Sequence, residues 1–275
     1  MASFDKKSPV LSVKDLQVSF HIENKTIKAL KGISFDLYKR EIVALVGESG
    51  SGKSVTCYSI LKLLPKYASF SGKISLQSEK ISVDNILSSD DNLLRKIRGN
   101  IISMVFQEPS AVLNPLLTIG DQIVETILAH QNIPYEEAQK KALEAMKKAH
   151  IPEPEKRFYQ YPHELSGGLK QRVVIAIAVA NNAEVLLADE PTTALDVTVS
   201  AQILKLFKSL KENLGISILL ITHDLGVVAE IADRVLVIYK GEIVEEGDVF
   251  DIFDNPKHPY TRKLLDSRPK ISDII

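Results

Sequence analysis

The sequence predicts an α/β fold with a mostly parallel sheet, an N-terminal antiparallel β layer and an inserted helical subdomain. Short apolar runs recur along the chain, separated by segments of helical length, and this spacing favours a parallel sheet because parallel strands need crossover helices. The runs lie at residues 42–46, 101–106, 185–188, 218–221 and 235–239. The first is an unbroken apolar pentamer, as expected of a strand buried on both faces.

The N-terminal stretch alternates apolar and polar residues, which indicates strands with one buried face. The apolar positions are Leu11, Val13, Leu16, Val18 and Phe20, followed by Ile33, Phe35 and Leu37. Between Pro109 and Pro162 the spacing becomes helical and no convincing strand is found. We therefore expect a single domain over residues 1–275, in which 109–162 form the helical subdomain and 249–275 form a C-terminal tail.

Composition narrows the class of protein. The formal net charge of −1 provides no broad field that would favour nucleic acid or an anionic membrane surface. The single cysteine, Cys57, excludes an internal disulfide and fits a reducing cytoplasm. Residues 1–10 lack the apolar stretch of a signal peptide, and the longest apolar run, 173–180, is far shorter than the roughly 20 residues of a membrane span. We expect a cytoplasmic protein that reaches a membrane only through a partner.

A glycine-rich octet follows the buried strand and precedes a plausible helix that ends near Pro65. It reads Gly47-Glu48-Ser49-Gly50-Ser51-Gly52-Lys53-Ser54 and matches the phosphate-loop pattern G-x-x-x-x-G-K-[ST]. Glycines let successive N–H groups point at one oxyanion, and the helix start adds positive potential. We expect Lys53 to reach the β- and γ-phosphates of ATP, Ser54 to ligate Mg²⁺, and Val55 to belong to the nucleotide site. The alternative is a strand-to-helix turn without a ligand.

Two carboxylates stand at the end of the strand that begins at residue 185. Asp189 suits the Mg²⁺ shell, and Glu190 suits activation of the attacking water, because in-line attack needs a base opposite the leaving group. The alternative is a strand that ends in solvated acids before a proline turn. The phosphate loop upstream favours the catalytic interpretation, since open α/β sheets bind ligands at the carboxyl ends of their strands. The core is thus predicted to be that of a phosphate-loop NTPase.

The segment Leu165-Ser166-Gly167-Gly168-Leu169-Lys170-Gln171-Arg172 resembles the signature sequence of ATP-binding-cassette (ABC) ATPases. The order of motifs is also similar to this family over nearly the whole chain. In chain order these motifs are the octet at 47–54, Gln107 after a strand, the signature, the acidic pair at 189–190, Ala194-Leu195-Asp196, and His223 after the last core strand. Leu169 and Thr193 depart from the commonest residues of the family, but neither departure removes a phosphate ligand.

A serine and two glycines at a helix start supply a hydroxyl and bare N–H groups, so Ser166 and Gly168 suit a γ-phosphate. One chain cannot easily bring them to its own phosphate loop. The resemblance implies two cassettes packed head to tail, with each nucleotide between the phosphate loop of one and the signature of the other. It also implies that Gln107 touches Mg²⁺ or the attacking water, and that His223 contacts the γ-phosphate and holds that water in line.

For each remaining candidate residue, a simpler interpretation stands beside the functional one. Phe20 is the candidate for stacking on adenine, although an aromatic at a strand end is usually core and His21 could serve instead. Asp196 suits a loop that meets the partner cassette, and it equally suits the N-cap of the helix after it. For Gln107 the alternative is an ordinary polar loop residue, and for His223 a structural histidine.

The stretch Asn255-Pro256-Lys257-His258-Pro259-Tyr260-Thr261-Arg262-Lys263-Leu264-Leu265 resembles the tail of ATPase subunits that serve oligopeptide and dipeptide importers. The resemblance implies a peripheral ATPase on the cytoplasmic face of the membrane, which powers peptide import. Its implied partners are two integral-membrane permeases, a second cassette, homologous or identical, and indirectly an extracytoplasmic solute-binding protein. Relatives in this group also move nickel or other small solutes. This chain lacks the cysteines for the iron–sulfur cluster found in some members.

Two functions other than transport are compatible with parts of the sequence. Cassette ATPases of chromosomes and DNA repair need a long coiled coil, for which the insert is too short, and translation factors usually carry two cassettes per chain. A small-molecule kinase with a phosphate loop leaves the signature at 165–172 unexplained. Neither rival accounts for the motifs as well as a transporter ATPase, and nucleic acid is not an expected partner.

Overall fold

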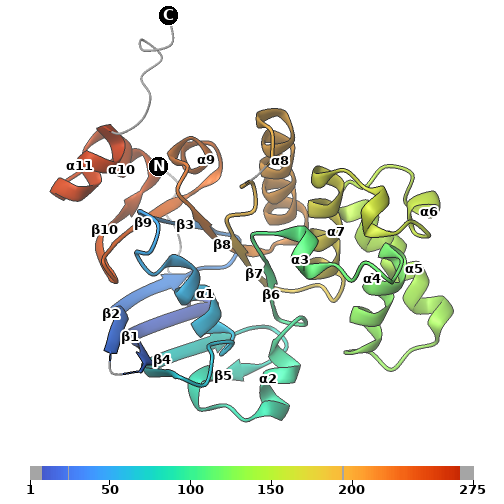
Figure 1. Ribbon diagram of the computed structural model, residues 1–275, viewed down its shortest axis with the longest axis horizontal. Coiled ribbons are helices and arrows are strands. Elements are labelled where there is room, and N and C mark those ends of the chain that lie inside the picture. Colours follow the sequence, from blue (N-terminus) through green and yellow to red (C-terminus); the bar gives the residue numbers. More distant parts are fainter. Residues whose placement is uncertain (1–7, 24, 194, 267–275) are drawn as a thin grey trace, which may run out of the picture. The chain divides into compact units, whose positions relative to one another are not determined.

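The structure, a computed structural model, describes residues 8–23, 25–193 and 195–266. The chain divides into two compact units (Figure 1). Unit 1 comprises Met1–Ser88 and Leu219–Ile275, and unit 2 comprises Ser89–Ile218. In sequence, unit 2 is therefore an insertion between the two halves of unit 1.

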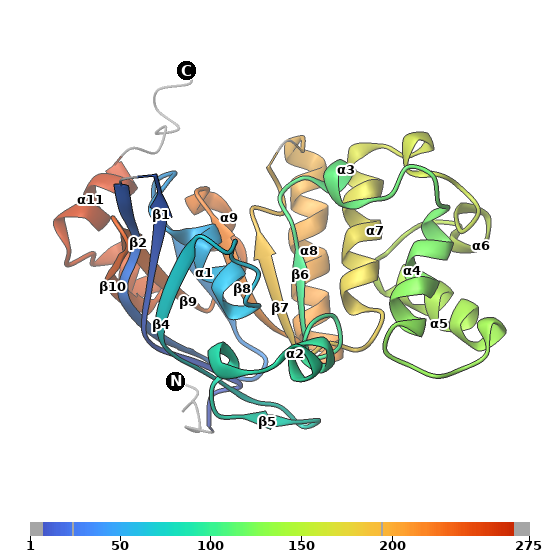
Figure 2. The same cartoon turned by 60° about the horizontal axis from the view of Figure 1, so that its bottom comes forward.

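Unit 1 contains a four-stranded antiparallel sheet in the order β2-β1-β4-β5 (Figure 2). Its strands are β1 (Leu11–Ile22), β2 (Lys25–Leu37), β4 (Ala68–Gln77) and β5 (Ser82–Val83). The apolar alternation changes phase between Val13 and Leu16, and a β-bulge lies there, with Asp15 in the left-handed region at φ 46°. The extra residue keeps both apolar side chains in the core. The predicted antiparallel layer is confirmed.

The parallel strands are the ones that the apolar runs predict. In unit 1, β3 pairs in parallel with β9, and β10 adds an antiparallel edge to β9. In unit 2, β6 pairs in parallel with β7. The bounds are β3 (Ile42–Val46), β6 (Ile102–Val105), β7 (Val185–Asp189), β8 (Ser217–Thr222), β9 (Arg234–Tyr239) and β10 (Glu242–Asp248). Within unit 1 the order is β10-β9-β3-β8, and the division between the units falls inside β8. The α/β fold class is confirmed.

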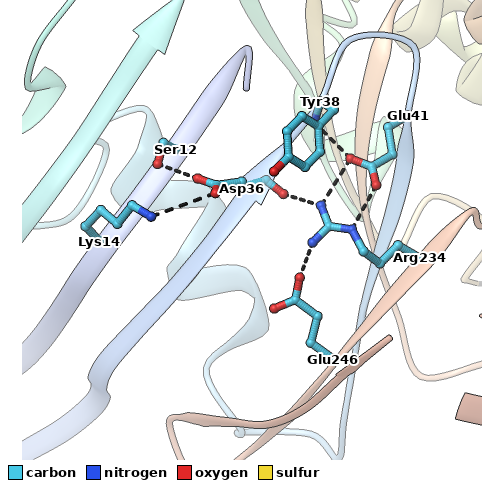
Figure 3. A network of polar contacts seen from close by, with 7 residues as sticks. All are labelled: Ser12, Lys14, Asp36, Tyr38, Glu41, Arg234 and Glu246. Carbon is cyan, nitrogen blue, oxygen red and sulfur yellow. Dashed lines mark hydrogen bonds and ion pairs between the residues drawn. The ribbon is translucent and has the colours of Figure 1, made fainter. Parts of the chain in front are cut away.

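A cluster of charges around Arg234 ties the strands of unit 1 together (Figure 3). The guanidinium donates to both carboxylate oxygens of Glu41, at 2.8 and 3.1 Å, and also to Glu246 on β10 and the carbonyl of Asp36 on β2. Tyr38 lies under the cation, with 5.6 Å between Cζ and the ring centroid. Burial lowers the pKa of Arg234, but its bonds to Glu41 and Glu246 outweigh burial and raise it overall. A single cation thus joins the start of β9 to both sheets of the unit.

Two helices of unit 1 begin at a carboxylate that accepts from N–H groups of the first turn. Asp224 accepts from Gly226 N at 2.7 Å and Asp248 accepts from Phe250 N at 2.9 Å, so these two carboxylates cap α9 and α10. Figures 1 and 2 show α10 and α11 beside β10. The helices are α1 (Lys53–Ile60), η1 (Ile86–Ser88), α9 (Leu225–Ile231), α10 (Val249–Asp254) and α11 (Pro259–Asp266).

Unit 2 carries most of the helices. From 109 to 162 the elements are helical, and α5 buries the apolar face that the sequence spacing predicts, at Ala138, Ala142, Ala145 and Met146. The helices are α2 (Asp91–Ile97), α3 (Pro109–Val112), α4 (Ile119–Leu128), α5 (Tyr135–Lys148), α6 (Pro154–Arg157), η2 (Pro162–Glu164), α7 (Gly167–Val179) and α8 (Val197–Leu214). Across the described residues, none of the helices has the length and apolar character needed to cross a membrane.

Candidate functional site

The phosphate loop joins β3 to α1 in unit 1. Gly50 and Gly52 have φ of 77° and 110°, a region that residues with a side chain rarely adopt, so these two positions require glycine. Ser51 N donates to Glu48 O at 3.2 Å, which closes the loop on itself. The loop is also fixed from outside, because Gly241 N donates to Ser51 O at 3.0 Å. The octet therefore forms a compact turn at the amino end of a helix.

Close packing adds a second reason for glycine at the start of the loop. A Cβ at Gly47 would lie 2.2 Å from the carbonyl oxygen of Ile238 on β9. Lys53 is buried at 5% exposure, and its Nζ donates to Gly47 O at 2.8 Å and to Glu48 O at 3.0 Å. The ammonium is thus held over the loop by the loop's own carbonyls. A cation, left-handed glycines and a helix start in one turn fit the phosphates of a nucleotide.

The acidic strand end lies in unit 2. Asp189 is 2% exposed at the end of β7, and Glu190 follows in the left-handed region at φ 45°. Glu190 Oε2 accepts from Thr193 Oγ1 at 2.9 Å and from Gln107 Nε2 at 3.3 Å. Gln107 reaches it because β6 and β7 are parallel neighbours, with Val105 opposite Ala188, so both strands end at the same edge. The structure thus brings together Gln107 and Glu190, which are 83 residues apart in sequence.

The signature segment forms the start of α7 in unit 2. Ser166 is the N-cap residue, and its hydroxyl accepts from Leu169 N at a long 3.4 Å. Gly168 lies inside the helix, where a Cβ would stand 2.5 Å from Val199 Cγ1 on α8. Packing of α7 on α8 therefore requires a glycine at 168, whatever the segment binds. The first turn of a helix has N–H groups without helical partners, and here they follow a serine hydroxyl.

The other predicted residues are found in both units. Phe20 is half-buried in β1, with its ring centroid 6.0 Å from that of Tyr67. His223 is exposed directly after β8. Asp196 Oδ1 accepts from Val199 N at 2.9 Å, so it is the N-cap of α8, the plainer of its two interpretations. Its neighbour Ala194 lies outside the described residues, as does the end of the tail, 267–275.

Oxygen donors for a metal are divided between the units. Ser54 is the second residue of α1 in unit 1, whereas Gln107 and Asp189 belong to unit 2. Hydroxyl, amide and carboxylate oxygens are hard ligands that suit Mg²⁺. Among the described residues, no group of three or more His, Cys, Asp and Glu could hold a metal ion by itself. Because Mg²⁺ takes several of its ligands from water and substrate phosphates, the donors of each unit suit it without forming a closed cage.

Sequence reasoning missed two hydroxyl groups at these sites. In the sequence Thr193 stands out only as a departure from a family pattern, yet its hydroxyl donates to Glu190. Tyr260 stands out only as part of the tail motif, yet its hydroxyl accepts from the backbone N–H of Glu48 at 2.9 Å. The three-residue spacing of Thr193 and Glu190 could have suggested the first contact. No local signal points to the second, since 212 residues separate its partners.

Comparisons with known proteins identify the family of the chain. A family model described as ABC transporter matches residues 30–193, and one described as the C-terminal region of oligopeptide/dipeptide transporters matches residues 244–274. The dipeptide transport ATP-binding protein DppD of Bacillus subtilis (strain 168) is 49% identical over 264 residues, which cover 95% of this chain and 77% of DppD. The oligopeptide transport ATP-binding protein OppD of the same strain is 48% identical, with 95% and 72% covered. A solved dimer of the ATP-binding cassette MJ0796, in a post-hydrolysis state bound to ADP and Pi, is 33% identical with a TM-score of 0.74, covering 87% of this chain and 98% of that chain.

Proposed function

The chain belongs to the ABC transporter family, and we propose that it is the ATP-hydrolysing subunit of a membrane importer of peptides. One observation carries the proposal, namely that a single chain joins the cassette match at 30–193 to the peptide-transporter match at 244–274. The phosphate loop of unit 1 and the acidic strand end of unit 2 supply the residue types that ATP hydrolysis needs. The proposal includes the organisation as one cassette over residues 1–275, with 109–162 as its helical subdomain and 249–275 as its tail.

In this proposal the nucleotide is held by the loop residues 47–55. Lys53 contacts the β- and γ-phosphates, and Phe20 stacks on adenine. Ser54, Gln107 and Asp189 would hold Mg²⁺, which would neutralise charge that develops on the phosphates. The support is the buried Lys53 ammonium, which already lies over two loop carbonyls.

Glu190 is the proposed base for the attacking water. Its carboxylate accepts a proton from the water as the water oxygen bonds to the γ-phosphorus, while the bond from that phosphorus to the β-phosphate oxygen breaks and ADP leaves. His223 holds the attacking water in line. Hydrogen bonds from Gln107 and Thr193 to Glu190 Oε2 orient the carboxylate. Because phosphoryl transfer is catalysed mainly by positioning the reacting groups, we count the contacts of Gln107 and Thr193 with Glu190 as part of the catalytic site.

The proposed assembly is a pair of cassettes on two integral-membrane permeases, at the cytoplasmic face. Ser166 and Gly168 of one cassette contact the γ-phosphate bound by the other, and this places ATP in the interface. An extracytoplasmic solute-binding protein delivers the peptide, and nucleic acid plays no part. The exposed helix start at Ser166 supports this arrangement, because its N–H groups suit an anion supplied from outside unit 2.

Replacing Glu190 with glutamine tests the proposal. Glu190→Gln keeps the shape of the side chain but removes the base, so phosphate release by the reconstituted transporter should fall at least about 100-fold while ATP still binds. Glu125→Gln, on an exposed face of α4, is the matched control and should hydrolyse ATP like the wild type. Near-normal phosphate release by Glu190→Gln would reject the assigned role.

A further inference from the structure

The segment before α11 is tied to β10 by one carboxylate. Glu245 Oε1 accepts from Lys257 N at 2.7 Å, and Oε2 accepts from His258 N at 3.0 Å. His258 Nδ1 in turn accepts from Tyr260 N at 3.1 Å. Partial burial raises the pKa of Glu245, but the bonds that it accepts, including these two N–H groups, lower it overall. The start of α11 is therefore held in a defined position on unit 1.

That position places the Tyr260 ring in the core of the unit. The side chain is 7% exposed and packs in an apolar cluster that includes Val46, the last residue of β3, and Val237 on β9. Its ring centroid lies 4.2 Å from that of Tyr239. Packing on two sides fixes the direction of the hydroxyl, which accepts from Glu48 N at 2.9 Å. The contact thus joins the C-terminal region to the second residue of the phosphate loop.

Glu48 is held at both ends of its backbone. Its N–H donates to Tyr260, while its carbonyl oxygen accepts from Lys53 Nζ at 3.0 Å and from Ser51 N at 3.2 Å. If the N–H lost its acceptor, the peptide between Gly47 and Glu48 could rotate. The Gly47 carbonyl, which belongs to that peptide and accepts from the Lys53 ammonium at 2.8 Å, would then move with it. The hydroxyl of Tyr260 is therefore coupled, through one peptide, to the cation of the loop.

We propose that Tyr260 is a positioning residue for ATP binding, which holds the phosphate loop in its binding shape through the Glu48 N–H. This inference rests on the proposed function, because it takes the loop to be the ATP site. It gives the C-terminal region matched at 244–274 a role in nucleotide binding within its own chain. Burial raises the pKa of Tyr260, so the hydroxyl stays neutral and the contact persists across the physiological pH range.

The test compares two variants that each lose one hydroxyl from the same pair of rings. Tyr260→Phe keeps the ring but removes the acceptor of Glu48 N, whereas Tyr239→Phe leaves that bond intact. We expect Tyr260→Phe to bind a fluorescent ATP analogue about fivefold more weakly, which is the usual effect of one lost hydrogen bond, and to raise KM for ATP with kcat kept. Tyr239→Phe should match the wild type in both measurements.

Two outcomes would overturn the inference. One is wild-type ATP affinity in Tyr260→Phe, and if the unfolding temperature of that variant is lowered at the same time, the contact is a structural anchor only. The other is equal weakening of ATP binding in both variants, which would assign the effect to ring packing.

A measurement on the wild type covers the case in which Tyr260→Phe does not fold. Exchange of the Glu48 amide proton, followed by NMR without nucleotide, should be slow if Tyr260 accepts its hydrogen bond, and exchange as fast as in an open loop would overturn the inference.

Failure of the proposed function would give a different result. In that case the wild type would not bind ATP, or Lys53→Ala would bind it equally well, while the Glu48 amide would still report on the Tyr260 contact.

Discussion

The phosphate loop and the signature segment are both glycine-rich and both lead into a helix, but they are built differently. In the loop, Gly50 and Gly52 adopt positive φ, and the turn is closed by hydrogen bonds from its own unit. In the signature, Gly168 is helical, and it is required because a side chain would strike Val199. One set of glycines shapes a backbone, whereas the other lets two helices approach.

This difference predicts how each segment binds an anion. The loop gathers a cation, Lys53, and N–H groups in a single turn, so we expect it to bind nucleotide within one chain. The signature offers a helix start capped by Ser166, which contributes only a few donors. It suits an anion that another surface already holds. The loop should therefore govern affinity, and the signature should govern turnover in the assembled pair.

The largest expected effect is on the loop side. Lys53→Ala should weaken ATP binding by the isolated chain about 100-fold, because a charged donor contributes up to about 3 kcal/mol and the loop carbonyls also lose their partner. Lys66→Ala, at an exposed position after α1, is the charge-matched control and should bind normally. Isothermal titration with ATP measures both. Wild-type affinity in Lys53→Ala would mean that the phosphate loop does not govern nucleotide affinity.

A change in the signature segment should have the reverse effect, with ATP affinity kept and turnover lowered. Ser166→Ala should leave the ATP affinity of the isolated chain within about twofold of wild type but lower turnover of the assembled transporter about tenfold, through loss of one hydroxyl contact. The change also removes a helix cap, at a cost of about 1 kcal/mol. Asp90→Ala removes the cap of α2 in the same unit, where the carboxylate accepts from Leu93 N at 2.8 Å. If Asp90→Ala lowers turnover equally, the effect of Ser166→Ala is one of stability and not of phosphate contact.

The same contrast explains what the sequence could predict. The octet and the pair Asp189 and Glu190 were predictable, because a strand, a turn and a helix start are specified within a few neighbouring residues. The packing reason for Gly168 was not, since it depends on Val199 in another helix. Nor was the contact of Tyr260 with the loop, because a hydroxyl-to-amide bond across 212 residues leaves no periodic trace. Pattern reasoning finds chemistry that is local in the chain and misses the supports that tertiary packing supplies.

The last prediction, with the smallest change, tests the backbone conformation of a glycine separately from its packing. A Cβ at Gly50 would meet no atom within 4 Å, and one at Gly167 would only touch Leu195 Cδ2 at 3.7 Å, so neither alanine causes a clash. Gly50→Ala should still lower the free energy of unfolding by about 1–2 kcal/mol, since φ of 77° is costly for a residue with a side chain. Gly167→Ala, at the first position of α7, should change it by less than about 0.5 kcal/mol, because alanine favours the helix. Urea unfolding without nucleotide measures the difference. Equal losses of unfolding free energy in the two variants would contradict the distinction between the two kinds of glycine. Only at the left-handed position should a methyl group that causes no clash destabilise the fold.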